Sequence, residues 1–125
     1  MSEHLDSATV ARLVKEAVNG SSKAWEQLVE AHYGLLHTTA WSRLKDLEAT
    51  EDLVQEVFLR AWLQLRELKK PASFPYWIGR MARHLGSTWF RNQRRRSELL
   101  KLVEAKANEM EQVRDTAPTP DQQAM

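Results

Sequence analysis

The sequence predicts an all-α protein, a compact bundle of four principal helices with a flexible C-terminal tail. Apolar residues recur every three or four positions along most of the 125 residues, which is the spacing of one helical face. No stretch alternates apolar and polar residues as a half-buried strand does. The chain also has only four glycines and four prolines, so few residues interrupt its helices.

The first two expected helices follow each other closely. The first begins at a cap, Asp6 or Ser7, and ends at the Asn-Gly pair 19–20, which is typical of a helix C-terminus. Ser21 or Ser22 caps the second helix. The residues expected to face inward on these two helices are Val10, Leu13, Val14, Ala17, Val18, Trp25, Leu28, Val29, Leu36, Ala40, Trp41 and Leu44.

The third and fourth expected helices are separated by the Lys-Lys-Pro-Ala segment 69–72. The third runs from residue 49 or 50 to 68. The fourth begins after a cap at Ser73, with Pro75 in its first turn, where the missing N–H costs nothing. We expect it to run into an arginine cluster and to continue to about residue 103. The inward residues of these helices are Leu53, Val54, Val57, Phe58, Ala61, Trp62, Leu65, Phe74, Trp77, Ile78, Met81, Leu85 and Trp89.

We expect one domain over residues 1–100 and a linker or tail over 101–125, disordered at its end, because residues 115–125 have almost nothing to bury. The absence of cysteine excludes disulfides and thiolate metal sites and fits a reducing compartment. The N-terminus lacks the pattern of a signal peptide, and no apolar run is long enough to span a bilayer. We therefore expect a cytoplasmic protein without membrane contact.

The net charge of +1 conceals an uneven distribution of charge. Residues 80–101 hold seven arginine and lysine residues against one glutamate, a net charge of +6. The rest of the chain carries a net charge of −5 and includes a run, residues 46–56, with five acidic residues and no basic one. This separation of charge predicts two binding surfaces of opposite sign.

Catalysis and metal binding have little support in the sequence. The spacing of the histidines (His4, His32, His37 and His84) makes no metal-binding face, and we expect each to lie at or near the surface. The carboxylates of Asp52 and Glu56 are four residues apart, but they lie in an acidic helix start, which the helix dipole favours. No glycine-rich phosphate loop or catalytic triad is present. We predict no catalytic residue, no metal site and no cofactor.

The fourth expected helix carries a basic face. The spacings between its residues are 4, 3, 4, 4 and 3, which place Tyr76, Arg80, Arg83, Ser87, Arg91 and Arg94 together. Arginine binds phosphate through paired N–H groups, and aromatic rings stack on unpaired bases. This face therefore predicts contact with nucleic acid, the alternative being an ordinary solvated face.

The third expected helix carries an acidic face. Asp52, Gln55 and Glu56 point away from the apolar stripe of this helix in the expected arrangement. An exposed acidic surface fits a basic protein partner. From the residues alone, a solvated face without a partner is an equal alternative.

Three segments together resemble bacterial alternative sigma factors of the extracytoplasmic-function class. They are Ala24-Trp-Glu-Gln-Leu-Val-Glu-Ala-His-Tyr33, Ala49-Thr-Glu-Asp-Leu-Val-Gln-Glu-Val-Phe-Leu-Arg-Ala-Trp62 and Phe74-Pro-Tyr-Trp-Ile-Gly-Arg-Met-Ala-Arg83, followed by an arginine-rich helix end. The resemblance is to the second conserved region of sigma-70 proteins and covers residues 5–97. It implies the fold of that region and a function in transcription initiation.

The resemblance also implies roles for individual residues. Binding to the clamp helices of the largest subunit of core RNA polymerase is implied for Asp52, Leu53, Val54, Gln55 and Glu56. Recognition of the minus-ten element of promoter DNA, with capture of a non-template-strand base, is implied for Lys69, Lys70, Ser73, Phe74, Tyr76, Arg80, Arg83, His84, Ser87, Arg91, Arg94 and Arg95. We expect Trp77 to pack in the core instead. An anti-sigma factor is a further partner that the resemblance implies.

Two features depart from the family pattern. His84 stands where the family commonly has asparagine, so base preference does not carry over to this position. The family's fourth region, a helix-turn-helix that reads the minus-thirty-five element, is absent. We expect the chain to be a piece of a longer sigma factor, because Pro118-Thr-Pro120 resembles an interdomain connector; a natural protein without that region is the alternative.

Other functions remain open from the sequence. The main alternative is a helical protein-interaction adaptor whose basic helix binds an acidic partner and no DNA. A general RNA-binding bundle is a second alternative, and an enzyme is a distant third.

Overall fold

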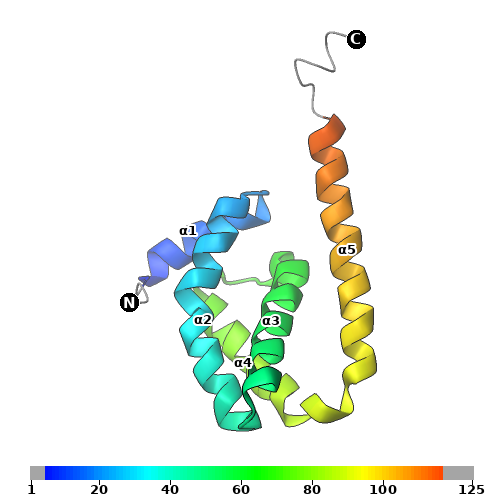
Figure 1. The fold of residues 1–125 in the computed structure, drawn as a ribbon. Coiled ribbons are helices and arrows are strands. Elements are labelled where there is room, and N and C mark those ends of the chain that lie inside the picture. The colour runs from blue at the N-terminus through cyan, green and yellow to red at the C-terminus, as the bar shows by residue number, and fades with distance from the viewer. Residues whose placement is uncertain (1–4, 117–125) are drawn as a thin grey trace. The chain divides into compact units, whose positions relative to one another are not determined.

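The computed structural model describes residues 5–116, with side chains described for residues 5–92 and 96–110. Every regular element in this part of the chain is a helix, which confirms the predicted all-α fold (Figure 1). The α-helices are α1 (Ser7–Val18), α2 (Ser22–Leu44), α3 (Leu47–Gln64), α4 (Phe74–Ser87) and α5 (Gln93–Thr116), and short 3-10 turns occupy Leu65–Glu67, Pro71–Ser73 and Trp89–Arg91.

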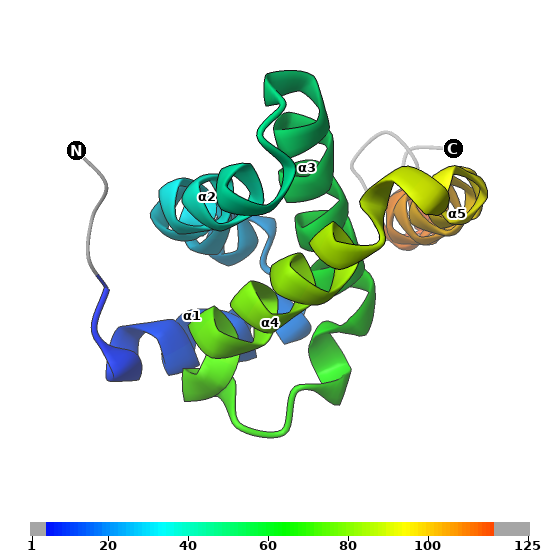
Figure 2. The same cartoon turned by 90° about the horizontal axis from the view of Figure 1, so that it is seen from below.

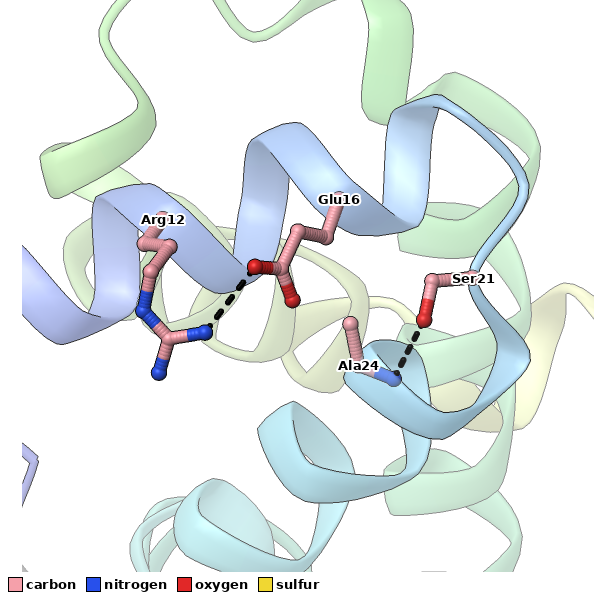
Figure 3. A network of polar contacts seen from close by, with 4 residues as sticks. All are labelled: Arg12, Glu16, Ser21 and Ala24. Atoms are coloured by element: carbon pink, nitrogen blue, oxygen red, sulfur yellow. Dashed lines mark hydrogen bonds and ion pairs between the residues drawn. The ribbon is translucent and has the colours of Figure 1, made fainter.

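Local capping fixes the starts of α1 and α2 where the sequence predicts them. The carboxylate of Asp6 accepts a hydrogen bond from the Thr9 amide at 2.7 Å. Hydrogen bonds from the Thr9 backbone and side chain lower the pKa of Asp6. The hydroxyl of Ser21 accepts from the Ala24 amide at 3.1 Å, close to an exposed Arg12–Glu16 ion pair on α1 (Figure 3). These bonds satisfy amides that the first turn of a helix leaves unpaired.

Helix α3 begins earlier than the sequence predicts. Lys45 ends α2 in the left-handed conformation, with φ of 53°. The chain then reverses at Asp46, whose carboxylate accepts from the Ala49 amide at 2.8 Å. Asp46 is thus the cap of α3, so the helix starts at residue 47 and not at 49 or 50.

Helix α4 ends at Ser87, so the expected continuation to residue 103 is wrong. Gly86 lies against α2 and α3: a Cβ atom there would be 3.3 Å from Arg43 and 3.4 Å from Leu53. The chain leaves the helix directly after this contact. Residues 89–91 form a 3-10 turn, which the Asn92 side-chain amide closes by donating to the Thr88 hydroxyl at 2.7 Å.

The first four helices form one body that ends at Asn92, and a second unit begins at Gln93. Within the body, α2 packs against α1, α3 and α4 (Figures 1 and 2). Its core cluster of buried residues is drawn from residues 10–89. Most residues expected to face inward do so. Trp41 is the main exception, because 42% of its surface is exposed.

The expected domain boundary at residue 100 lies inside α5, and it stays a prediction. The expected tail beyond residue 116, with Pro118 and Pro120, lies outside the described residues. None of the described helices has the length and apolar character that crossing a membrane requires.

Candidate nucleic-acid and protein interfaces

Helix α4 has one buried side and one exposed basic side. Ile78, Ala82 and Leu85 are buried in the core of the body. The exposed residues, which we call the basic face of α4, are Tyr76, Arg80, Arg83, His84 and Ser87. Within the described part of the chain, neither Arg80 nor Arg83 forms an ion pair, so both guanidinium groups are available to a phosphate.

Arg83 and Tyr76 lie together on this face. The guanidinium carbon of Arg83 is 6.0 Å from the centre of the Tyr76 ring, within the range of a cation–π contact. The arginine reaches back along the helix over Gly79, where an added Cβ would be 3.5 Å from its Nη1 atom. Tyr76 remains 67% exposed. The face therefore presents an aromatic ring and a cation in contact.

The start of α4 is anchored by a cluster of rings, and Phe74 is at its centre. The Phe74 ring is fully buried, with ring centres at 5.1 Å from His32, 6.1 Å from Trp25 and 6.2 Å from Trp77. The expected contact of Phe74 with DNA is therefore incompatible with this arrangement. Its burial fixes the position of the preceding loop, residues 69–73.

The remaining residues expected at the DNA surface are distributed over several elements. Lys69 and Lys70 are exposed in the loop before α4, and Ser73 is half-buried. Arg91 is exposed, but it lies on the 3-10 turn after α4 and so does not continue the face of that helix. The side chains of Arg94 and Arg95 lie outside the described residues.

Phe90 is an exposed residue that the sequence analysis missed. Its side chain is 64% exposed, whereas that of its neighbour Trp89 is only 4% exposed. The adjacent arginine cluster indicated a binding surface near this residue, but the helical spacing predicted that the fourth helix continues through it. Because that helix ends at Ser87, the orientation of residue 90 could not be read from the spacing.

His32 is buried, contrary to the expectation that each histidine lies near the surface. Its Nδ1 atom is 2.7 Å from the Leu28 carbonyl oxygen, which accepts the hydrogen bond of the Nδ1–H tautomer. Burial lowers the pKa of His32 from its ordinary value of 6.5, and the hydrogen bond to Leu28 opposes this shift. His32 is therefore a neutral part of the ring cluster under α4.

Helix α3 presents an acidic face. Glu48, Glu51, Asp52 and Gln55 are all exposed, and their spacing of 3, 1 and 3 places them on one side of the helix. The exposed Asp52 and Gln55 agree with the sequence analysis, and the structure adds Glu48 and Glu51. We call these four residues the acidic face of α3.

Glu56 does not belong to this face, although the sequence analysis placed it there. Only 5% of its surface is exposed, and its Oε2 atom accepts a hydrogen bond from Arg60 Nε at 2.8 Å. Leu53 and Val54 are buried in the core. The side chains of these three residues are buried and are therefore not part of the exposed acidic face.

The described residues contain no cluster of three or more histidine, aspartate or glutamate side chains that could hold a metal ion.

Both charged faces lie within a segment of the chain that matches a known protein family. Residues 28–96 match the family described as sigma-70 region 2. The chain is 35% identical over 112 residues to a probable RNA polymerase sigma factor, RfaY, from Xanthomonas campestris pv. campestris. The aligned segment covers 87% of this chain and 26% of that protein. The chain is 30% identical over 71 residues to the ECF RNA polymerase sigma factor SigX from Bacillus subtilis, which covers 57% of this chain and 37% of that protein.

The chain thus spans about a quarter of the first relative and little more than a third of the second. No solved structure matches it significantly.

Proposed function

Because the chain belongs to the sigma-70 family, as its region 2, we propose that it binds core RNA polymerase and holds the melted minus-ten element of a promoter. The observation that carries this proposal is the presence of two exposed faces of opposite charge within the matched residues 28–96. The charge of each face suits a different partner. The protein would act in the cytoplasm by binding, without a reaction of its own.

The acidic face of α3 is the proposed polymerase site. Asp52 and Gln55 correspond to the family segment that docks on the clamp helices of the largest polymerase subunit. Their side chains are exposed, and they stand on a helix whose other side is fixed in the core by Leu53. A rigid acidic surface favours association with a basic one.

The basic face of α4 is the proposed site for the non-template DNA strand. Arg80 and Arg83 would bind phosphates, while Tyr76 would stack on an unpaired base. Extruding a base costs a few kcal/mol, and these contacts would offset that cost. An anti-sigma factor that covers either face would block the function.

The polymerase site is tested by reversing its charge. Asp52→Lys should weaken capture of core RNA polymerase in a pull-down assay, since it places a cation against a basic partner. Glu26→Lys, an equal change at an exposed position of α2, is the matched control and should leave capture unchanged. Unchanged capture by Asp52→Lys, with native helicity by circular dichroism, would remove the assignment.

The DNA site is tested with single-stranded and double-stranded minus-ten oligonucleotides at several salt concentrations. Arg80→Ala should weaken single-strand binding and reduce the slope of log K against log salt by about 0.7, the value for one lost phosphate contact. Lys15→Ala on α1 is the control. Absence of single-strand binding at low salt would favour the adaptor function, and equal binding of unrelated RNA would favour a general RNA-binding protein.

A further inference from the structure

We propose that Phe90 is a second base-stacking residue, which contacts an unpaired base of the DNA strand beyond the C-terminal end of α4. This inference rests on the proposed function and extends its site beyond the basic face of α4. Phe90 is 64% exposed, which makes it, with Tyr76, one of two largely exposed aromatic side chains between residues 69 and 92.

The turn around Phe90 holds its ring outward. Trp89 is buried in the core cluster, so its neighbour in the 3-10 turn cannot point the same way. The Arg91 amide donates to the Thr88 carbonyl at 3.1 Å, and the Asn92 amide donates to the Trp89 carbonyl at 3.3 Å. A ring presented by an anchored turn loses little backbone freedom when it binds.

The charges around Phe90 favour nucleic acid as the occupant. Arg91 beside it is exposed, and no aspartate or glutamate occurs from residue 68 to residue 97. An aromatic ring among cations is the combination that binds single strands, because the cations contact phosphates and the ring stacks on a base of any type. The large exposed apolar residues Leu35 and Leu47, in contrast, lie on α2 and α3, outside this basic segment.

The spacing of the two aromatic residues fits contact with separate bases. Tyr76 and Ser87 are eleven residues apart on α4, which corresponds to about 16 Å along the helix axis. Phe90 follows in the turn beyond. Bases bound by Tyr76 and by Phe90 would therefore belong to different nucleotides of one strand, with the arginines between them.

The experiment measures binding of the full chain to short fluorescein-labelled single strands of randomised sequence. Phe90→Ala should weaken binding at least about fivefold, the lower range for the loss of one base–aromatic stack, and should leave the salt slope unchanged. Phe90→Leu should bind as weakly as Phe90→Ala, because leucine keeps apolar surface without a flat ring. Leu35→Ala, which removes a different exposed apolar side chain, one on α2 that is 50% exposed, is the control and should bind normally.

The outcomes separate this inference from the proposed function. If the unmodified chain binds and Phe90→Ala binds equally well, the inference is overturned and the proposed function stands. Full binding by Phe90→Leu would also overturn it, since a flat ring is then unnecessary. Loss of polymerase capture by Phe90→Ala, with DNA binding retained, would assign the ring to a protein contact. If the unmodified chain binds no strand, the inference fails together with the proposed DNA site, whereas the proposed polymerase site is tested separately by capture of core RNA polymerase.

Discussion

Asp52 and Glu56 are one helical turn apart on α3, yet they have different environments. The Asp52 side chain is exposed and has no ion pair within the described residues, whereas Glu56 is buried and paired with Arg60. A buried charge is expensive unless it is paired, and the pair fixes Arg60 along the helix. A carboxylate is therefore free to contact a partner at one position, as we propose for Asp52, and is held in an internal ion pair at the next turn.

We predict that Glu56→Ala destabilises the protein by about 1–3 kcal/mol, because it leaves the partly buried guanidinium of Arg60 without its partner. Asp52→Ala should change stability by no more than about 0.5 kcal/mol, as exposed substitutions usually do. Urea unfolding followed by circular dichroism measures both. Equal stability of the two variants would contradict the structural role of Glu56.

His32 predicts a dependence of stability on pH. Because burial lowers its pKa in the folded state, the unfolded chain takes up a proton below its ordinary pKa of 6.5 while the folded chain does not. Stability should therefore be fully present above this pH and should decrease as the pH falls through and below it. Urea unfolding between neutral pH and about pH 5 measures the effect.

The control for this prediction is the exposed His84. His32→Gln should remove most of the pH dependence in this range, whatever its effect on stability at neutral pH. His84→Gln should retain it, because the His84 side chain is exposed. An unchanged pH profile in His32→Gln would show that other groups cause the dependence.

At the scale of the helices, the features that could be predicted from the sequence are those fixed by neighbouring residues. Asp6 and Ser21 cap helices through bonds three residues away, and the sequence placed both starts correctly. The end of α4 lies instead next to a contact between distant segments, the approach of Gly86 to Arg43 and Leu53, which lie on other helices. Such contacts between distant segments leave no periodic signal in the sequence.

The residues of the binding faces can likewise be divided into those that neighbouring residues fix, which the sequence predicts, and those that distant contacts fix, which it does not. The exposed positions of Tyr76, Arg80, Arg83 and Ser87 follow from helical spacing alone, and the sequence predicted them. The burial of Glu56 could not be predicted in the same way, because this residue lies beside an acidic face. The apolar spacing did place Phe74 inward, and only the DNA contact that the family resemblance implied for it disagrees with the structure. The places of Glu56 and Phe74 are decided by Arg60 and by rings from α2, which only the folded chain brings together.

Glycines at two helical positions should respond oppositely to substitution. Gly34 lies inside α2 with no atom within 4 Å of an added Cβ, so Gly34→Ala should stabilise the protein by about 0.5–1 kcal/mol through helix propensity. Urea unfolding measures the gain. A loss of stability would mean that the exposed side of α2 tolerates no side chain there.

The contrasting substitution is Gly86→Val, at the glycine that lies against other helices. A Cβ at this position would be 3.3 Å from Arg43 before the two further methyl groups are added, so we expect destabilisation by about 1–3 kcal/mol. Stability equal to that of the unmodified chain would show that α4 can move away from α2 without cost.

At the scale of the whole molecule, the net charge of +1 is the sum of a basic segment, residues 80–101 with a net charge of +6, and the rest of the chain with a net charge of −5. The acidic face lies on α3 and the basic face on α4, and both helices pack into one core that is drawn from residues 10–89. The core thus holds the two proposed sites in fixed positions. The arginine cluster at residues 94–96 belongs to the second unit.

We predict that a chain ending at Asn92 still unfolds cooperatively, because it retains the complete core cluster. It should keep polymerase capture but bind single-stranded DNA more weakly and with a smaller salt slope, since it lacks the arginines at 94–96. Urea unfolding and fluorescence anisotropy measure the two properties. Loss of the cooperative transition would place essential packing beyond residue 92, and would favour the expected boundary near residue 100.

The turn between α4 and α5 has a consequence for the evolution of the chain. One residue inserted between Phe74 and Trp89 would rotate the following part of α4 by about 100° and carry arginines from the exposed side into the core. An insertion or deletion after Asn92 leaves every residue of the core cluster in place. Among descendants of one ancestral gene, length should therefore be invariant from Phe74 to Trp89 and free to vary after Asn92.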